Sequence, residues 1–121
     1  MLASLNQIQK QYWDFRAREI CQELGLTQDQ ENDLIATMWC ESGMNQYAQN
    51  ANTDGTTDYG ICQLNSYWYI GSGKVVKTPQ EALNNPELCI RVMASQFLNG
   101  RPNDWICYRS GKYKNYYGKT N

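Results

Sequence analysis

The sequence predicts an α+β fold that is mainly helical, with a small antiparallel β-sheet inserted between helices. The chain has 121 residues, which is about the size of one compact domain. Apolar residues recur at helical spacing in both halves of the chain, whereas turn and strand residues dominate between positions 47 and 65. We therefore expect a single domain, residues 1–121, in which a sheet separates two groups of helices.

The first predicted helix runs from Leu5 to Leu24 and ends at Gly25. Its apolar positions are spaced as on one helical stripe: Leu5, Ile8, Tyr12, Phe15, Ile20, Cys21 and Leu24.

The second helix is predicted to begin after Thr27. Thr27 and Gln30 form a capping-box pattern, in which each side chain satisfies a free backbone amide of the first turn. This helix should stop near Ser42-Gly43, which leaves Glu41 in its last turn.

Turn residues then predict the sheet. Asp54-Gly55 is a strong signal for a hairpin turn, and two or three short strands are expected between Tyr47 and Asn65. A looser segment should follow through Lys77.

Helices resume after position 77. Thr78-Pro79 and Asn85-Pro86 each place a capping residue before a proline in the first turn, and Gly100 ends the second of these helices. Asn103 is expected to cap a last short helix that carries Trp105, Ile106 and Tyr108.

Composition excludes several classes of protein. The net charge is -1, but residues 1–58 carry 3 basic and 9 acidic side chains, and residues 59–121 carry 8 and 3. This division favours a cleft with acidic chemistry on one wall beside a basic surface. The basic residues are scattered and form no nucleic-acid-binding signature, so no nucleic-acid partner is expected. No apolar stretch reaches the roughly 18 residues of a membrane span, and Met1–Lys10 lacks the pattern of a secretory signal.

The cysteines predict little cross-linking. The five are Cys21, Cys40, Cys62, Cys89 and Cys107, an odd number that allows two bridges at most. We expect them to be mostly reduced and buried as small apolar side chains. The chain has no histidine and no C-x-x-C motif, so no structural metal site and no cofactor are expected.

Two carboxylates stand in contrasting surroundings. Glu41 follows the apolar residues Met38, Trp39 and Cys40 at a helix end, where desolvation and the helix dipole both raise the pKa of an acid. Asp58 is surrounded in sequence by hydroxyl and amide side chains that favour its charged form. Glycoside cleavage uses such a pair, one carboxyl to donate a proton and one carboxylate to stabilise the positive sugar centre.

The segment that holds these acids resembles the c-type lysozymes. The matching stretches are Glu41-Ser42-Gly43-Met44-Asn45 and Asn52–Ser66, which reads NTDGTTDYGICQLNS. The resemblance implies that Glu41 is the general acid and that Asp58 is the nucleophile or charge stabiliser. It also implies that sugars bind along Asn52, Gln63, Asn65, Trp68, Tyr69 and Trp105. The five cysteines do not fit the four bridges of that family.

The chain also resembles the lytic transglycosylases with a soluble-lytic-transglycosylase domain. The corresponding motifs are Glu41–Asn45, Gly60-Ile61-Cys62-Gln63 and Cys107–Gly111, the last of which adds Tyr108 to the expected sugar-binding residues. That family uses one glutamate, and the C6 hydroxyl of the muramic sugar replaces water to give a 1,6-anhydro product. Asp58 is then dispensable.

From these resemblances we expect a peptidoglycan-degrading muramidase that cleaves the β-1,4 bond between N-acetylmuramic acid and N-acetylglucosamine. Asp58 favours hydrolysis, the lytic transglycosylase is the alternative, and a non-catalytic glycan-binding protein is a third. We expect a monomer of phage or bacterial origin that acts on the cell wall, in the periplasm or outside the cell.

Overall fold

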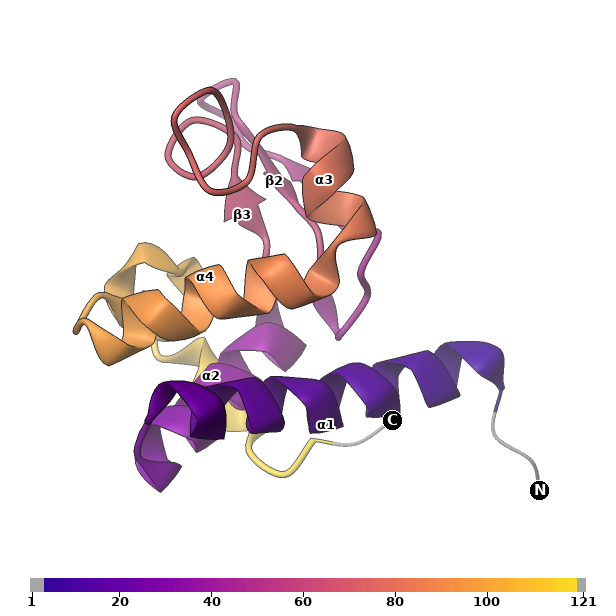
Figure 1. The fold of residues 1–121 in the computed structure, drawn as a ribbon, viewed down its shortest axis with the longest axis vertical. Helices are drawn as coiled ribbons and strands as arrows, with labels where there is room; N and C mark the ends of the chain where they lie inside the picture. Colours follow the sequence, from indigo (N-terminus) through magenta and orange to yellow (C-terminus); the bar gives the residue numbers. More distant parts are fainter. Residues whose placement is uncertain (1–3, 120–121) are drawn as a thin grey trace.

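The computed structural model describes residues 4–119, and within them it has the predicted α+β architecture. The three strands are β1 (Gln49–Ala51), β2 (Thr57–Tyr59) and β3 (Leu64–Asn65). The helices are α1 (Leu5–Leu24), α2 (Gln28–Ser42), α3 (Pro79–Asn84), α4 (Pro86–Leu98) and α5 (Ile106–Arg109), with 3-10 helices η1 (Pro102–Asp104) and η2 (Lys112–Tyr116). The sheet and α3 lie on one side of α4, and α1 lies on the other (Figure 1). The ends of the predicted domain, residues 1–3 and 120–121, lie outside the described residues.

The first two helices confirm the predicted bounds and caps. The Thr27 hydroxyl accepts from the Gln30 amide at 3.1 Å, and the Gln30 side chain accepts from the Thr27 amide at 2.8 Å. Gly43 ends α2 in the left-handed conformation, with φ 61°. A glycine tolerates this conformation without steric cost, so the helix stops just after Glu41.

The sheet is antiparallel, with strand order β1-β2-β3. Asp58, at the centre of β2, faces Asn50 on one side and Asn65 on the other. The predicted Asp54-Gly55 turn lies between β1 and β2, and Gly55 has φ 89°. Helix α3 packs near the end of the central strand β2, where the glycine after β2, Gly60, approaches the Ala82 backbone.

Helix α1 buries only part of its apolar stripe. Ala17, Ile20 and Cys21 are fully buried in the core, whereas Leu5 is 79% exposed and Phe15 is 61% exposed. The N-terminal end of α1 extends beyond the other helices (Figure 1), which accounts for the exposure of Leu5 at its start. Phe15 lies in the middle of the helix and is on its exposed side.

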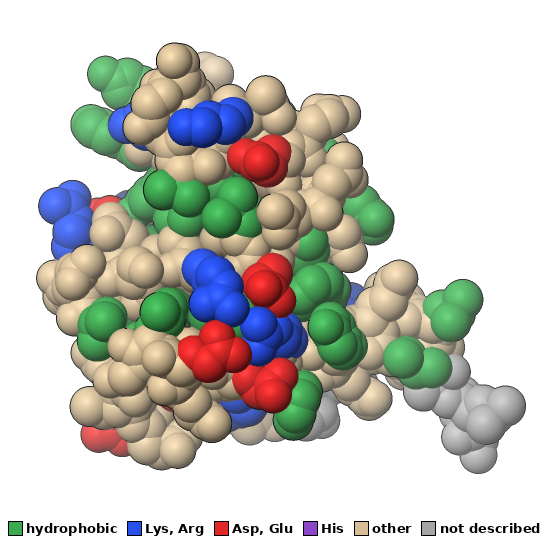
Figure 2. All heavy atoms as spheres, viewed as in Figure 1, with side chains coloured by type: hydrophobic (Ala, Val, Ile, Leu, Met, Phe, Trp, Pro, Cys, Tyr) green, Lys and Arg blue, Asp and Glu red, His purple; other side chains and the backbone are tan. Residues whose placement is uncertain are grey.

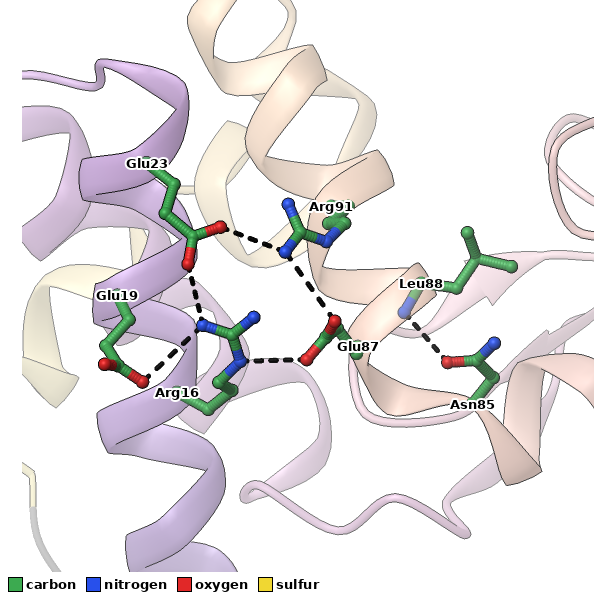
Figure 3. Close-up of polar contacts among 7 residues, drawn as sticks. All are labelled: Arg16, Glu19, Glu23, Asn85, Glu87, Leu88 and Arg91. Atoms are coloured by element: carbon green, nitrogen blue, oxygen red, sulfur yellow. Dashed lines mark hydrogen bonds and ion pairs between the residues drawn. The ribbon is translucent and has the colours of Figure 1, made fainter.

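An ion-pair network joins α1 to α4. The guanidinium of Arg16 lies 2.8 Å from Glu87 and 3.0 Å from Glu23, and Arg91 lies 3.0 Å from Glu23 (Figure 3). Charges of both signs meet at this junction on the face seen in Figure 2. Close arginines lower the pKa of the Glu23 carboxyl, so these surface acids are held ionised.

One predicted helix start was wrong. Asn103 does not cap α5, because Pro102 begins a 3-10 turn and the Trp105 amide bonds to the Pro102 carbonyl at 3.1 Å. Trp105 itself is extended and precedes α5, which has no side-chain cap.

The cysteines are only partly as expected. Cys21, Cys62 and Cys89 are free and buried, and desolvation raises the pKa of the Cys21 thiol to about 12. Cys40 and Cys107, however, form a disulfide across a sequence separation of 67 residues. The contact that brings them together is tertiary, so spacing in the sequence did not reveal it.

Two features are absent from residues 4–119. No helix there is long and apolar enough to cross a membrane. No three acidic, cysteine or histidine side chains in that range are grouped so that they could hold a metal ion.

Candidate active site

A cleft of about 500 Å³ is lined by residues of the sheet region and by residues of the helices. Its sheet wall consists of strand and loop residues: Asn52, Asp58, Gln63, Asn65, Trp68 and Tyr69. Its helical wall includes Glu41, Gln96, Asp104, Trp105, Ile106 and Arg109. The volume lies in the usual range for small-molecule sites, and six of the seven binding residues expected from the sequence line it together with both acids.

The end of α2 positions Glu41. Glu41 Oε2 accepts a hydrogen bond from the Cys107 amide at 3.0 Å, and the next residue, Ser42, donates its hydroxyl to the Ile61 carbonyl at 2.6 Å. The second contact fastens the helix end to the segment between β2 and β3. Within residues 4–119, no hydrogen bond is made to the other Glu41 oxygen, Oε1, so it remains available to a ligand.

Burial is the main influence on the acidity of Glu41. Desolvation raises the pKa of this carboxyl above its usual 4.5, and the negative charge of Asp58 acts in the same direction. The Cys107 amide opposes them, followed by the more distant charges of Arg109 and Lys112. The balance raises the pKa of Glu41, which is the direction that the sequence predicted. The sequence did not reveal the opposing amide, which belongs to the backbone.

Trp105 forms the buried part of the helical wall and is 3% exposed. Its indole N–H donates to the Cys62 carbonyl at 2.7 Å, and its ring lies 5.5 Å from Tyr69 and 5.7 Å from Phe97, between ring centroids. The indole therefore links the helical wall to the segment between β2 and β3.

Asp58 occupies the middle of the sheet wall. Its Oδ1 accepts from the Asn65 side-chain amide at 3.0 Å, and the same amide donates to the Thr56 hydroxyl at 3.0 Å. Asn52 also donates to that hydroxyl at 3.0 Å. Asp58 is half-buried, and a polar network from neighbouring strands orients it.

Gln63 lines the cleft but also organises the sheet. It adopts φ 52°, and its side-chain amide donates to the carbonyls of Gly60 at 3.0 Å and Ala48 at 3.2 Å. Its oxygen accepts from Asn50 at 2.8 Å. These bonds use both the nitrogen and the oxygen of the side-chain amide. Gln63 therefore shapes the sheet wall of the cleft through its contacts within the protein.

The two expected stacking residues differ. Trp68 is 68% exposed, which leaves its face open to a ligand. The Tyr69 hydroxyl instead donates to Asp104 at 2.5 Å and accepts from Gln96 at 3.1 Å. Burial and the Asp104 carboxylate raise the pKa of Tyr69 to about 12. Sequence reasoning missed Gln96 and Asp104, although Asp104 directly precedes Trp105.

Tyr108 does not line the cleft. Its ring stacks on Tyr113 at 4.6 Å and meets the edge of Phe97 at 5.6 Å. Because α5 makes about one turn, Tyr108 points to the opposite side from the cleft residues Ile106 and Arg109. This expected sugar contact is therefore replaced by a packing role.

Known proteins resemble parts of this chain. The model of a family described as the Transglycosylase SLT domain matches residues 21–107, a span that includes both acids. A stretch of 38 residues is 55% identical to lysozyme C-1 of Anas platyrhynchos, and it covers 31% of this chain and 26% of that protein. The chain thus aligns with about a quarter of the length of this curated relative.

Proposed function

The chain belongs to the Transglycosylase SLT domain family, and from this premise we propose that it cleaves peptidoglycan at the β-1,4 bond between N-acetylmuramic acid and N-acetylglucosamine. The observation that carries the proposal is the pair of carboxyl groups in one cleft, with Glu41 on the helical wall and Asp58 on the sheet wall. The site of action is then the cell wall, in the periplasm or outside the cell.

In the proposed reaction, protonated Glu41 donates its proton to the glycosidic oxygen as the bond to the muramic sugar breaks. A raised pKa supports this role because a general acid must hold its proton near neutral pH. The Asp58 carboxylate stabilises or traps the positive anomeric carbon. The Glu41 carboxylate then takes a proton from water, whose oxygen attacks that carbon. Where Asp58 has trapped the carbon, this attack breaks the bond to Asp58 and releases its carboxylate.

The other cleft residues support sugar binding. Trp68 offers an open aromatic face for the C–H surface of a pyranose ring, and Asn52 and Asn65 offer amides at the rim. Trp105 shields the acid from water on the helical wall.

Transglycosylation is a second candidate, and the family match favours it. In this reaction Glu41 alone acts as acid and then as base, and the C6 hydroxyl of the muramic sugar attacks its own anomeric carbon. Hydrolysis remains our first choice because Asp58 is oriented by Asn65 in the same cleft.

Digestion of purified sacculi followed by mass spectrometry of the muropeptides tests the proposal. Hydrolysis yields reducing muramic ends, whereas transglycosylation yields anhydro ends that are lighter by one water. Anhydro products would overturn hydrolysis and establish the second candidate. If the wild-type chain released nothing but still bound the glycan, the non-catalytic alternative would replace both.

A further inference from the structure

We propose that the Cys40–Cys107 disulfide is a positioning element for Glu41, which holds the Cys107 amide on Glu41 Oε2 and leaves Oε1 free to carry the acid proton. The catalytic consequence of this inference rests on the proposed function. The structural part rests on contacts alone.

The disulfide joins the donor of one hydrogen bond, Cys107, to the residue beside its acceptor, Glu41. Cys40 directly precedes Glu41 in α2, and Cys107 is the residue whose amide donates to the Glu41 carboxyl at 3.0 Å. The two cysteines are separated by 67 residues in sequence. A covalent bond between the residue beside the acid and the residue that donates to it limits how far donor and acceptor can separate.

The donor segment needs such an anchor because α5 is short. It has four residues, and no side chain caps its N-terminus. A helix of this length makes few internal hydrogen bonds, so tertiary contacts fix its position. The Trp105 indole bond to Cys62 anchors the residue before the helix, but Cys107 lies two positions further on and next to Ile106, which is 60% exposed.

The remaining cysteines provide a contrast. Cys21, Cys62 and Cys89 are buried free thiols, and none of them lines the cleft. The disulfide is therefore formed by the pair of cysteines that touches the acid, while cysteines elsewhere in the core act as apolar side chains.

A looser Cys107 amide has a measurable consequence. That N–H bond favours the ionised carboxylate and so lowers the pKa of Glu41 against the larger effect of burial. If the bond lengthens, the Glu41 pKa rises. The proton is also delivered from a less fixed carboxyl, which slows the step without weakening sugar binding on the sheet wall.

The test compares the wild-type chain with Cys40→Ala/Cys107→Ala, which keeps the backbone amide but removes the bond. The control is Cys21→Ala, which removes a buried sulfur that does not line the cleft. Each protein is assayed for kcat and KM on soluble glycan fragments, for the pKa of Glu41 by ¹³C NMR of its carboxyl carbon, and for Tm. Reduction of the wild-type chain with a phosphine below its Tm, followed by reoxidation, provides the same comparison if the double variant does not fold.

We expect kcat of the double variant to fall roughly 10-fold to 100-fold with little change in KM, as for a misplaced catalytic group. The Glu41 pKa should rise, and the alkaline limb of the activity profile should move to higher pH. The control should change neither. A lower Tm with unchanged kcat and unchanged Glu41 pKa would overturn the inference, because the disulfide would then only stabilise the fold.

The NMR measurement separates this inference from the proposed function. If the wild-type chain cleaves no glycan while the Glu41 pKa still rises in the double variant, the proposed function fails and the positioning role stands. If the wild-type chain is active and the Glu41 pKa is the same in the double variant, the positioning role fails and the proposed function stands.

Discussion

The two walls of the cleft hold their carboxyl groups by different means. On the sheet wall, Asp58 accepts from Asn65, seven residues away in sequence. On the helical wall, Glu41 accepts from Cys107, 66 residues away. One acid is thus oriented by a local polar network and the other by tertiary contacts and burial. Local networks form wherever the strands form, whereas the environment of Glu41 requires the whole fold.

The largest expected effect tests the helical wall. Glu41→Gln keeps an oxygen that can accept from the Cys107 amide but has no acidic proton, so glycan cleavage should fall roughly 10²-fold to 10⁴-fold. Release of muropeptides from sacculi measures this loss. Glu23→Gln in the surface network is the matched control and should keep wild-type activity. Unchanged cleavage by Glu41→Gln would favour a glycan-binding role.

This contrast also determines what the sequence could predict. The sheet wall was predictable because its turn, strands and polar network fall within residues 47–65, and the resemblance to lysozymes covers that segment. Helix bounds were predictable where a capping box or an Asn-Pro pair marks them.

The helical wall was only partly predictable. Glu41 and Trp105 were found through resemblance, but the disulfide, the Cys107 donor and the bond from Tyr69 to Asp104 join residues 35 or more positions apart. Tyr108 was misplaced because a motif shows that a residue is present but not which side of a short helix it occupies. Packing against Phe97 and Tyr113 decides that.

Two glycines test how the sheet wall is supported. Gly60 has φ 84°, and a Cβ there would lie 2.6 Å from the Ala82 carbonyl oxygen, while Gly55 has φ 89° and nothing within 4 Å. Gly55→Ala should cost about 1–2 kcal/mol for the left-handed backbone, and Gly60→Ala should cost about 1–3 kcal/mol more because α3 must move. Urea denaturation measures both. Equal losses would mean that the contact between the sheet and α3 is not close packing.

Replacement of the other acid compares the two walls directly. If the reaction is hydrolysis, Asp58→Asn should lower kcat roughly 10²-fold or more, because the amide cannot offset the positive charge at the anomeric carbon. The matched control is Asp54→Asn in the adjacent exposed turn, which should keep kcat within about twofold of wild type, as expected for a surface carboxylate outside the cleft. A loss of only a few fold in Asp58→Asn would favour the intramolecular route to anhydro products.

The smallest expected effect is the change of stability with pH. Its sign differs between Glu41, whose pKa is set mainly by burial, and Glu23, whose pKa is set by ion pairs. The folded-state pKa of Glu41 is raised, so this residue lowers the stability of wild type as pH increases above 4.5. In that range the Glu41 carboxyl ionises in the unfolded chain but keeps its proton in the folded chain. Glu41→Gln should therefore gain stability relative to wild type between pH 4.5 and the folded-state pKa, and stay level above it. Glu23 has a lowered pKa, so its ion pairs stabilise wild type fully above 4.5 and are lost as pH falls through the folded-state pKa. Glu23→Gln should then lose stability relative to wild type as pH rises from the folded-state pKa of Glu23 to 4.5, and the difference should stay level above that pH. Denaturation at several pH values measures both differences, and slopes of the same sign would mean that burial does not control Glu41.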